Sequence, residues 1–169
     1  MVTPDQRDLD HVGRIMAQWR VERPDLDVSP QGIIGRLHRL AAHLNEELAV
    51  VYSQFDLGHG EFDVLATLRR AGAPYELTPS DLAAQTMVSS GAVTKRVDRC
   101  VEHGWVTRRV GEGDARSRVV ALTPAGLDLI DSAFEAHMAN EQRLVSSLDE
   151  LERTRLAGLL EKWGRTLGA

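Results

Sequence analysis

The sequence has a single cysteine, Cys100, and few aromatic residues, which make up 5% of its 169 positions. One cysteine excludes an intrachain disulfide and a CxxC pair for zinc or redox chemistry, and it agrees with a reducing compartment. No apolar run exceeds a few residues, and the first residues are polar, unlike a signal peptide. We therefore expect a cytoplasmic protein with no membrane span.

Motifs of common enzyme classes are also missing. The chain contains no HExxH, no GxSxG and no phosphate-binding loop. Of its six histidines, His38 and His43 are five residues apart, whereas two ligands on one helical face are four apart. His59 and Glu61 would need distant partners to bind a metal. We expect no metal and no cofactor, and a small helical enzyme is kept only as an alternative.

Hydrophobic residues (43%) and charged residues (27%) are present at the levels of an ordinary globular domain. The net charge is −5, but it is unevenly distributed. Residues 69–118 contain nine basic and six acidic side chains, and the rest of the chain has a net charge of −8. A basic middle segment is typical of a surface that binds phosphate, although a solvated face of mixed charge gives the same count.

Apolar residues recur at helical spacing through most of the chain. This spacing predicts helices over residues 8–22, 30–55 and 60–70, and two further helices after residue 123 and near residues 149–167. Only residues 105–122 depart from the pattern. Two short β-rich runs there flank a turn segment, residues 111–117, so we expect a β-hairpin.

A tight pair of helices precedes the hairpin. Thr78, Pro79 and Asp81 form a strong helix start, and Ser89 is a plausible cap for a second helix that ends at Gly104. Helix, short turn, helix and basic hairpin is the order of a winged helix-turn-helix. The sequence thus predicts a mainly α fold with a two-stranded β-hairpin wing that binds duplex DNA.

A projection of the second helix gives it a core face and an outer face. The core face contains Val93, Val97, Cys100 and Val101, so we interpret Cys100 as a small core residue rather than a redox switch. The opposite face, the start of the helix and the wing contain the predicted DNA-binding side chains: Ser89, Ser90, Thr94, Lys95, Arg99 and Arg118.

Arg96 does not follow the outer face of this helix. It projects toward the interior edge, where a guanidinium needs an acidic partner or a ligand. Asp63 interrupts the apolar run from Phe62 to Leu65 and is a candidate partner. The pair is either a structural ion pair or part of a ligand site.

Several motifs together resemble the MarR family of bacterial transcription regulators, from about residue 30 to the C-terminus. They are VSSGAVTKRVDR at residues 88–99, EHGWV at 102–106, DARS at 114–117 and LTPAG at 122–126. The resemblance implies a homodimer with interlocked terminal helices, operator binding by two winged lobes, and release of DNA by a small anionic ligand. It also implies that Arg116 approaches the minor groove and that Asp114 holds the shape of the wing.

The additional N-terminal helix is similar to that of the urate-responsive subgroup. The resemblance assigns binding of urate or a related purine to Trp19, Asp63 and Arg96, and Trp19 as plain core packing is the alternative. Ala71 stands about where the subgroup has an asparagine. A family member that senses a phenolic or other aromatic acid is the second candidate, and a helical interaction module without DNA binding is the third.

The predicted organisation has three parts. Residues 1–56 contain the additional helix, 8–22, and a dimerisation helix, 30–55. Residues 57–122 form the winged helix-turn-helix lobe. Residues 123–169 form the C-terminal helices, which complete the dimerisation region.

Overall fold

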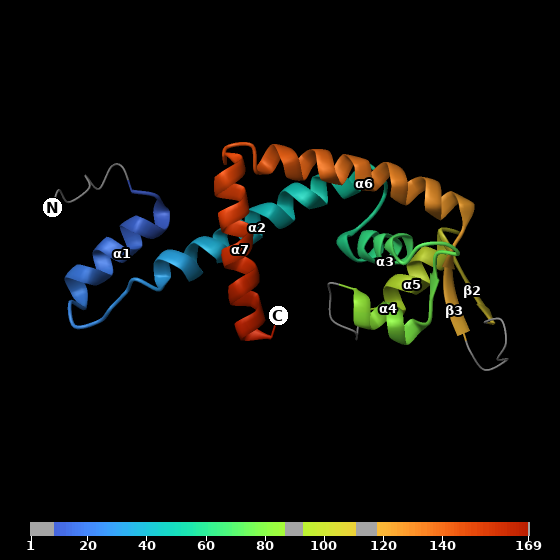
Figure 1. Cartoon of the computed structure of the whole chain (residues 1–169), viewed down its shortest axis with the longest axis horizontal. Coiled ribbons are helices and arrows are strands. Elements are labelled where there is room, and N and C mark those ends of the chain that lie inside the picture. Colours follow the sequence, from blue (N-terminus) through green and yellow to red (C-terminus); the bar gives the residue numbers. More distant parts are fainter. Residues whose placement is uncertain (1–8, 87–92, 111–117, 169) are drawn as a thin grey trace. The chain divides into compact units, whose positions relative to one another are not determined.

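The computed structural model describes residues 9–86, 93–110 and 118–168. The chain divides into two compact units, Met1–Glu47 and Leu48–Ala169, which we describe separately. The elements, labelled in Figure 1, are α1 (His11–Glu22), α2 (Gln31–Ser53), α3 (His59–Arg70), β1 (Glu76–Leu77), α4 (Pro79–Gln85), α5 (Val93–Glu102), β2 (Val106–Val110), β3 (Arg118–Leu122), α6 (Pro124–Leu144) and α7 (Glu150–Leu167).

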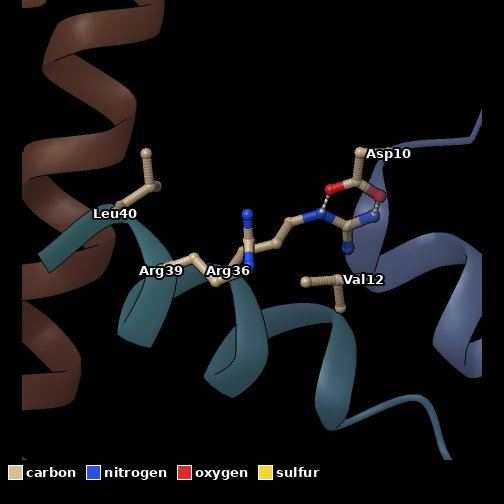
Figure 2. A pocket seen from close by; sticks show the side chains of 5 residues that line it. All are labelled: Asp10, Val12, Arg36, Arg39 and Leu40. Atoms are coloured by element: carbon tan, nitrogen blue, oxygen red, sulfur yellow. Dashed lines mark hydrogen bonds and ion pairs between the residues drawn. The ribbon is translucent and has the colours of Figure 1, made fainter. Parts of the chain in front are cut away.

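The first unit contains α1 packed on the N-terminal part of α2. Asp10 caps α1 by accepting a hydrogen bond from the Gly13 amide at 2.8 Å. Its carboxylate also accepts hydrogen bonds from Nε and Nη2 of Arg36, at 2.9 and 2.8 Å (Figure 2). A Cβ on Gly35 would lie 3.2 Å from Val12, so the missing side chain lets α1 approach α2 closely. The helix that apolar spacing predicts over residues 8–22 is therefore present as α1, and its N-terminal end is held on α2.

The core of the second unit lies where α3 meets α5, α6 and the sheet (Figure 1). Leu65 and Leu68 of α3, Val97 of α5 and Ile130 of α6 are almost completely buried there. No disulfide stabilises this core, since Cys100, the single cysteine of the sequence, is a buried free thiol. The hydrophobic effect acting on these side chains therefore positions α5 on α3.

The sheet contains one strand more than expected. β3 lies between β2 and β1, and both pairs are antiparallel. The β2–β3 hairpin was predicted, whereas β1 was not, because a strand of two residues has no measurable alternation. Since a two-stranded hairpin is marginally stable, pairing with β1 supports the wing at its base.

The start of α6 explains the LTPAG motif. The Thr123 hydroxyl accepts a hydrogen bond from the Gly126 amide at 3.0 Å and lies 2.8 Å from the Gly104 carbonyl oxygen. A Cβ on Gly126 would lie 2.8 Å from the Trp105 carbonyl carbon. The motif thus joins α6 to the segment between α5 and β2, and glycine is required by the close backbone approach.

The predicted C-terminal helices are α6 and α7. Asp149 and Glu152 form a reciprocal capping box at the start of α7. No residue of α7 is buried. None of the helices in the described segments is long and apolar enough to cross a membrane.

Candidate nucleic-acid interface

The predicted helix-turn-helix start is present in the structure. Thr78 caps α4 by accepting a hydrogen bond from the Asp81 amide at 3.1 Å, and Pro79 is the first residue of the helix. The residues between α4 and α5, including Ser89 and Ser90, lie outside the described segments. The two helices contact each other and both contact α3.

The faces of α5 agree with the projection except at one position. Val93, Val97 and Cys100 are buried, and Thr94 and Lys95 are exposed. Val101 was predicted in the core but is exposed. It is the second-last residue of α5, beyond the last buried residue of the helix, Cys100. Burial raises the pKa of the Cys100 thiol to about 12, with a further contribution from the charge of Glu61.

Several arginines of the basic segment form ion pairs with other elements of the same unit. Arg69 of α3 forms an ion pair with Asp131 of α6 at 2.6 Å, and Arg108 of β2 forms one with Asp98 of α5. Arg109 similarly pairs with a carboxylate of β1. The charge count of residues 69–118 included Glu76 and Asp98 but did not show which arginines they pair with, and Asp131 lies outside that segment.

The remaining cations are arranged differently. Within the described segments, no carboxylate forms an ion pair with Lys95 or Arg118, and both residues are exposed. Arg118 begins β3, opposite Val110 at the end of β2. Arg99 is half-exposed and contacts Glu61 of α3. The predicted wing residues Asp114 and Arg116 lie outside the described segments.

Arg96 lies against the first turn of α3, as its projection indicated. A Cβ on Gly60 would be 2.6 Å from Arg96 Cδ, so the guanidinium arm crosses the helix at a glycine. Arg96 Nη1 is buried and has no hydrogen-bond partner among the described residues. Asp63 is one helical turn after Gly60 and therefore on the same side of α3.

Flat rings gather against the first turns of α3. Tyr52 stacks on Phe62 with ring centroids 4.2 Å apart and contacts His59 edge to face at 5.0 Å. Its hydroxyl is 3.1 Å from Nδ1 of His137. Burial raises the pKa of Tyr52 to about 12, and the negative charges of Glu141 and then Asp63 contribute. The sequence analysis missed this aromatic cluster, because its members come from α2, α3 and α6.

Trp19, the third predicted ligand residue, belongs to the other unit. It lies near the end of α1, and 45% of its surface is exposed. A pocket of about 300 Å³ in this unit is lined by Asp10, Val12, Arg36, Arg39 and Leu40, and not by Trp19 (Figure 2). In the described segments, no three His, Cys, Asp or Glu side chains are grouped to hold a metal ion.

Comparison with known proteins gives a consistent result. A family model described as "MarR family" matches residues 55–117. The HTH-type transcriptional regulator PecS of Dickeya dadantii is 44% identical over 149 residues, which are 88% of this chain and 90% of PecS. The multiple antibiotic resistance protein MarR of Escherichia coli is 30% identical over 76% of this chain and 89% of MarR.

Solved structures give the same fold. The crystal structure of an E. coli MarR variant complexed with operator DNA has a TM-score of 0.68, with 30% identity, and covers 81% of this chain and 98% of that one. AbsC, a MarR family transcriptional regulator from Streptomyces coelicolor, has a TM-score of 0.75 with 23% identity over 84% of this chain and 96% of AbsC.

Proposed function

Because this chain belongs to the MarR family of transcriptional regulators, we propose that it is a repressor that binds its operator as a homodimer and leaves it when a small anion binds. It is a DNA-binding regulator and not an enzyme. Regulators of this family are generally dimeric. The dimer, the sign of regulation and the effector are our proposals for this chain.

The exposed face of α5 supports the proposed contact with DNA. This helix enters the major groove, where Thr94, Lys95 and Arg99, with Ser89 and Ser90, meet phosphates and base edges. We propose that Arg116 and Arg118 contact the minor groove or the adjacent phosphates. Asp114 is proposed to hold the wing in shape. The functional lobe is residues 57–122.

The uncovered apolar face of α7 carries the proposal of a homodimer. This helix has no buried residue, and five of its leucines are exposed: Leu151, Leu156, Leu159, Leu160 and Leu167. Phe134 and Met138 of α6 are also exposed. Exposed apolar side chains that gather on one helix mark an interaction surface. A second copy covers it, and residues 1–56 and 123–169 form the dimerisation region.

A charged substitution on α7 tests the homodimer. Leu159 is 65% exposed, so its burial in a dimer contributes about 1–2 kcal/mol per subunit. The two copies in a dimer double this, so we expect Leu159→Glu to raise the dimer dissociation constant at least about 30-fold. Arg165→Gln on the same helix is the control. Sedimentation equilibrium that finds an unchanged dimer in Leu159→Glu would remove this interface.

The unpartnered Nη1 of Arg96 supports the proposed effector site. A buried guanidinium nitrogen without a hydrogen bond is costly, and an anionic oxygen would satisfy it. Asp63 on the same side of α3 and the rings of the aromatic cluster provide polar and flat surfaces for a purine such as urate. Trp19, which belongs to the other unit, is kept as a proposed ligand-binding residue on the family resemblance alone. Since Arg96 lies on α5, a ligand that moves it changes the position of Lys95 relative to DNA.

Fluorescence anisotropy with a labelled duplex from the DNA beside the gene tests the whole proposal at fixed salt. Urate is expected to release wild-type protein, and Arg96→Ala is expected to bind DNA but to lose this response. Arg165→Ala, with the same change in charge on α7, should respond like wild type. Binding that a phenolic acid releases and urate does not would replace the effector, and an unaltered urate response in Arg96→Ala would remove the site.

The sign of regulation needs a separate measurement. Transcription in vitro from a template with the operator is expected to fall when the protein is added and to recover with urate. A rise on addition of the protein would make it an activator and contradict the proposed repression.

A further inference from the structure

Glu61 is a buried carboxylate that none of the roles above requires. It lies in the first turn of α3, is 8% exposed, and its Oε1 accepts a hydrogen bond from Nη1 of Arg99 at 3.2 Å. A carboxylate at this depth is costly unless it is paired. The contact joins α3, in the core of the unit, to a side chain on the proposed DNA face of α5.

The backbone before α3 leaves room for this carboxylate. A Cβ on Gly58 would lie 2.5 Å from Glu61 Oε2. Gly58 has φ −90° and ψ 170°, which any residue adopts, so its conformation does not demand glycine. A side chain at this position would therefore displace the Glu61 carboxylate, which is the end of a flexible side chain.

The charge of Glu61 also acts on the neighbouring residue of α5. The pKa of Cys100, the residue after Arg99, is raised first by burial and then by the negative charge of Glu61. The carboxylate thus lies between α3 and the C-terminal half of α5. Arg99 is the cation that compensates it there.

We propose that Glu61 is a positioning residue for operator binding, which holds Arg99 in place through one N–H and leaves its other donors for the DNA backbone. A guanidinium has five N–H donors in a rigid fork, so one side chain can contact a carboxylate and a phosphate together. The side chain of Arg99 is 55% exposed, which leaves donors accessible. The inference rests on the proposed DNA face of α5.

The expected effect follows from the cost of ordering a long side chain. An arginine that is already fixed loses less conformational freedom on binding, which corresponds to about 2- to 10-fold in affinity for each side chain. Two copies act in a dimer. We therefore expect Glu61→Gln to weaken operator binding about tenfold, although it removes a negative charge from the lobe.

A double-mutant cycle on the full chain tests this role. Operator affinity is measured by anisotropy for wild type, Glu61→Gln, Arg99→Gln and the double variant, with circular dichroism melting as the check of folding. Glu61→Gln should have no further effect when Arg99 is already absent. Glu102→Gln, the same charge change on an exposed residue of α5, is the control and should not weaken binding.

Gly58→Ala gives an independent test that keeps both partners. Its Cβ displaces the Glu61 carboxylate without backbone strain, so we expect weaker operator binding that also disappears in the Arg99→Gln background. An equal loss with and without Arg99, an unchanged affinity or a stronger affinity of Glu61→Gln would each overturn the positioning role. An Arg99→Gln variant that binds like wild type would remove Arg99 from the DNA face, whereas wild type that binds no duplex would remove the proposed function itself.

Discussion

Replacing Lys95 with glutamine isolates the phosphate contact that we assign to the exposed face of α5. Lys95 is exposed, and within the described segments no carboxylate neutralises it, so its charge is available to DNA. Each neutralised phosphate releases counterions and contributes about −0.9 to the slope of log affinity against log salt concentration. A dimer has two copies of Lys95, so the variant should lose about 1.8 from the magnitude of this slope.

The slope translates into a measurable difference in affinity. From about 50 to 200 mM salt, wild-type protein should lose about tenfold more affinity than Lys95→Gln, so their affinities converge as the salt concentration rises. Fluorescence anisotropy of an operator duplex at five or six salt concentrations gives both slopes. The comparison is between slopes, so it does not depend on the absolute affinity of either protein.

A control with the same change in net charge separates a contact from a general field effect. Arg165 lies on α7, its side chain is 78% exposed, and it pairs with Glu161 one turn earlier. Arg165→Gln should leave the slope unchanged. If Lys95→Gln and Arg165→Gln change the slope equally, or if neither changes it, Lys95 makes no phosphate contact and the assigned face of α5 is wrong.

Three further expectations concern the fold. Gly126→Ala should lower the free energy of unfolding by about 2–4 kcal/mol in urea titrations, because its Cβ meets the backbone of Trp105, and a loss under about 0.5 kcal/mol would contradict the close approach. Cys100 should resist thiol reagents at pH 8 until the chain is unfolded, since burial raises its pKa to about 12, and rapid labelling of folded protein would contradict its burial. Hydrogen bonds from Arg36 and then from the amide of Gly13 lower the pKa of Asp10 from 3.8, so its ion pair stabilises α1 above that pH and is lost as the pH falls through the lowered value. Asp10→Asn should therefore speed hydrogen exchange in α1 at pH 7 but no longer differ from wild type at low pH. Equal exchange rates at pH 7 would contradict the stabilisation of α1 by the Asp10–Arg36 ion pair.

Much of the fold was predictable because its signals are local. The Thr78 start signal predicted the beginning of α4, and helical spacing predicted α1 and α2 to within a few residues. The missed strand β1 is defined by its pairing with β3, not by its own two residues. Val101 was misplaced because a projection alone does not define where a helix leaves the core.

The candidate site was less predictable, because its contacts join distant elements. The projection correctly turned Arg96 inward, but only the structure places it across Gly60 with an unpartnered nitrogen. The Tyr52 hydroxyl contacts a histidine that is 85 residues away in sequence. Helical and strand periodicity relate only residues that are close in sequence, so they do not predict this contact. The pairing of Arg99 with Glu61 similarly spans 38 residues and two helices.

The acidic net charge and the DNA-binding role are compatible because internal ion pairs decide where positive charge is available. Arg69 pairs with a carboxylate of α6, and Arg108 and Arg109 pair with carboxylates of α5 and β1. These three arginines are therefore less available for phosphate contacts than their number suggests. Non-specific affinity grows with the number of phosphates contacted. We therefore expect weak binding to bulk DNA, with contacts to base edges and DNA shape separating the operator from other sequences. In the release mechanism that we propose, a small movement of α5 is then expected to be enough, because little non-specific attraction opposes it.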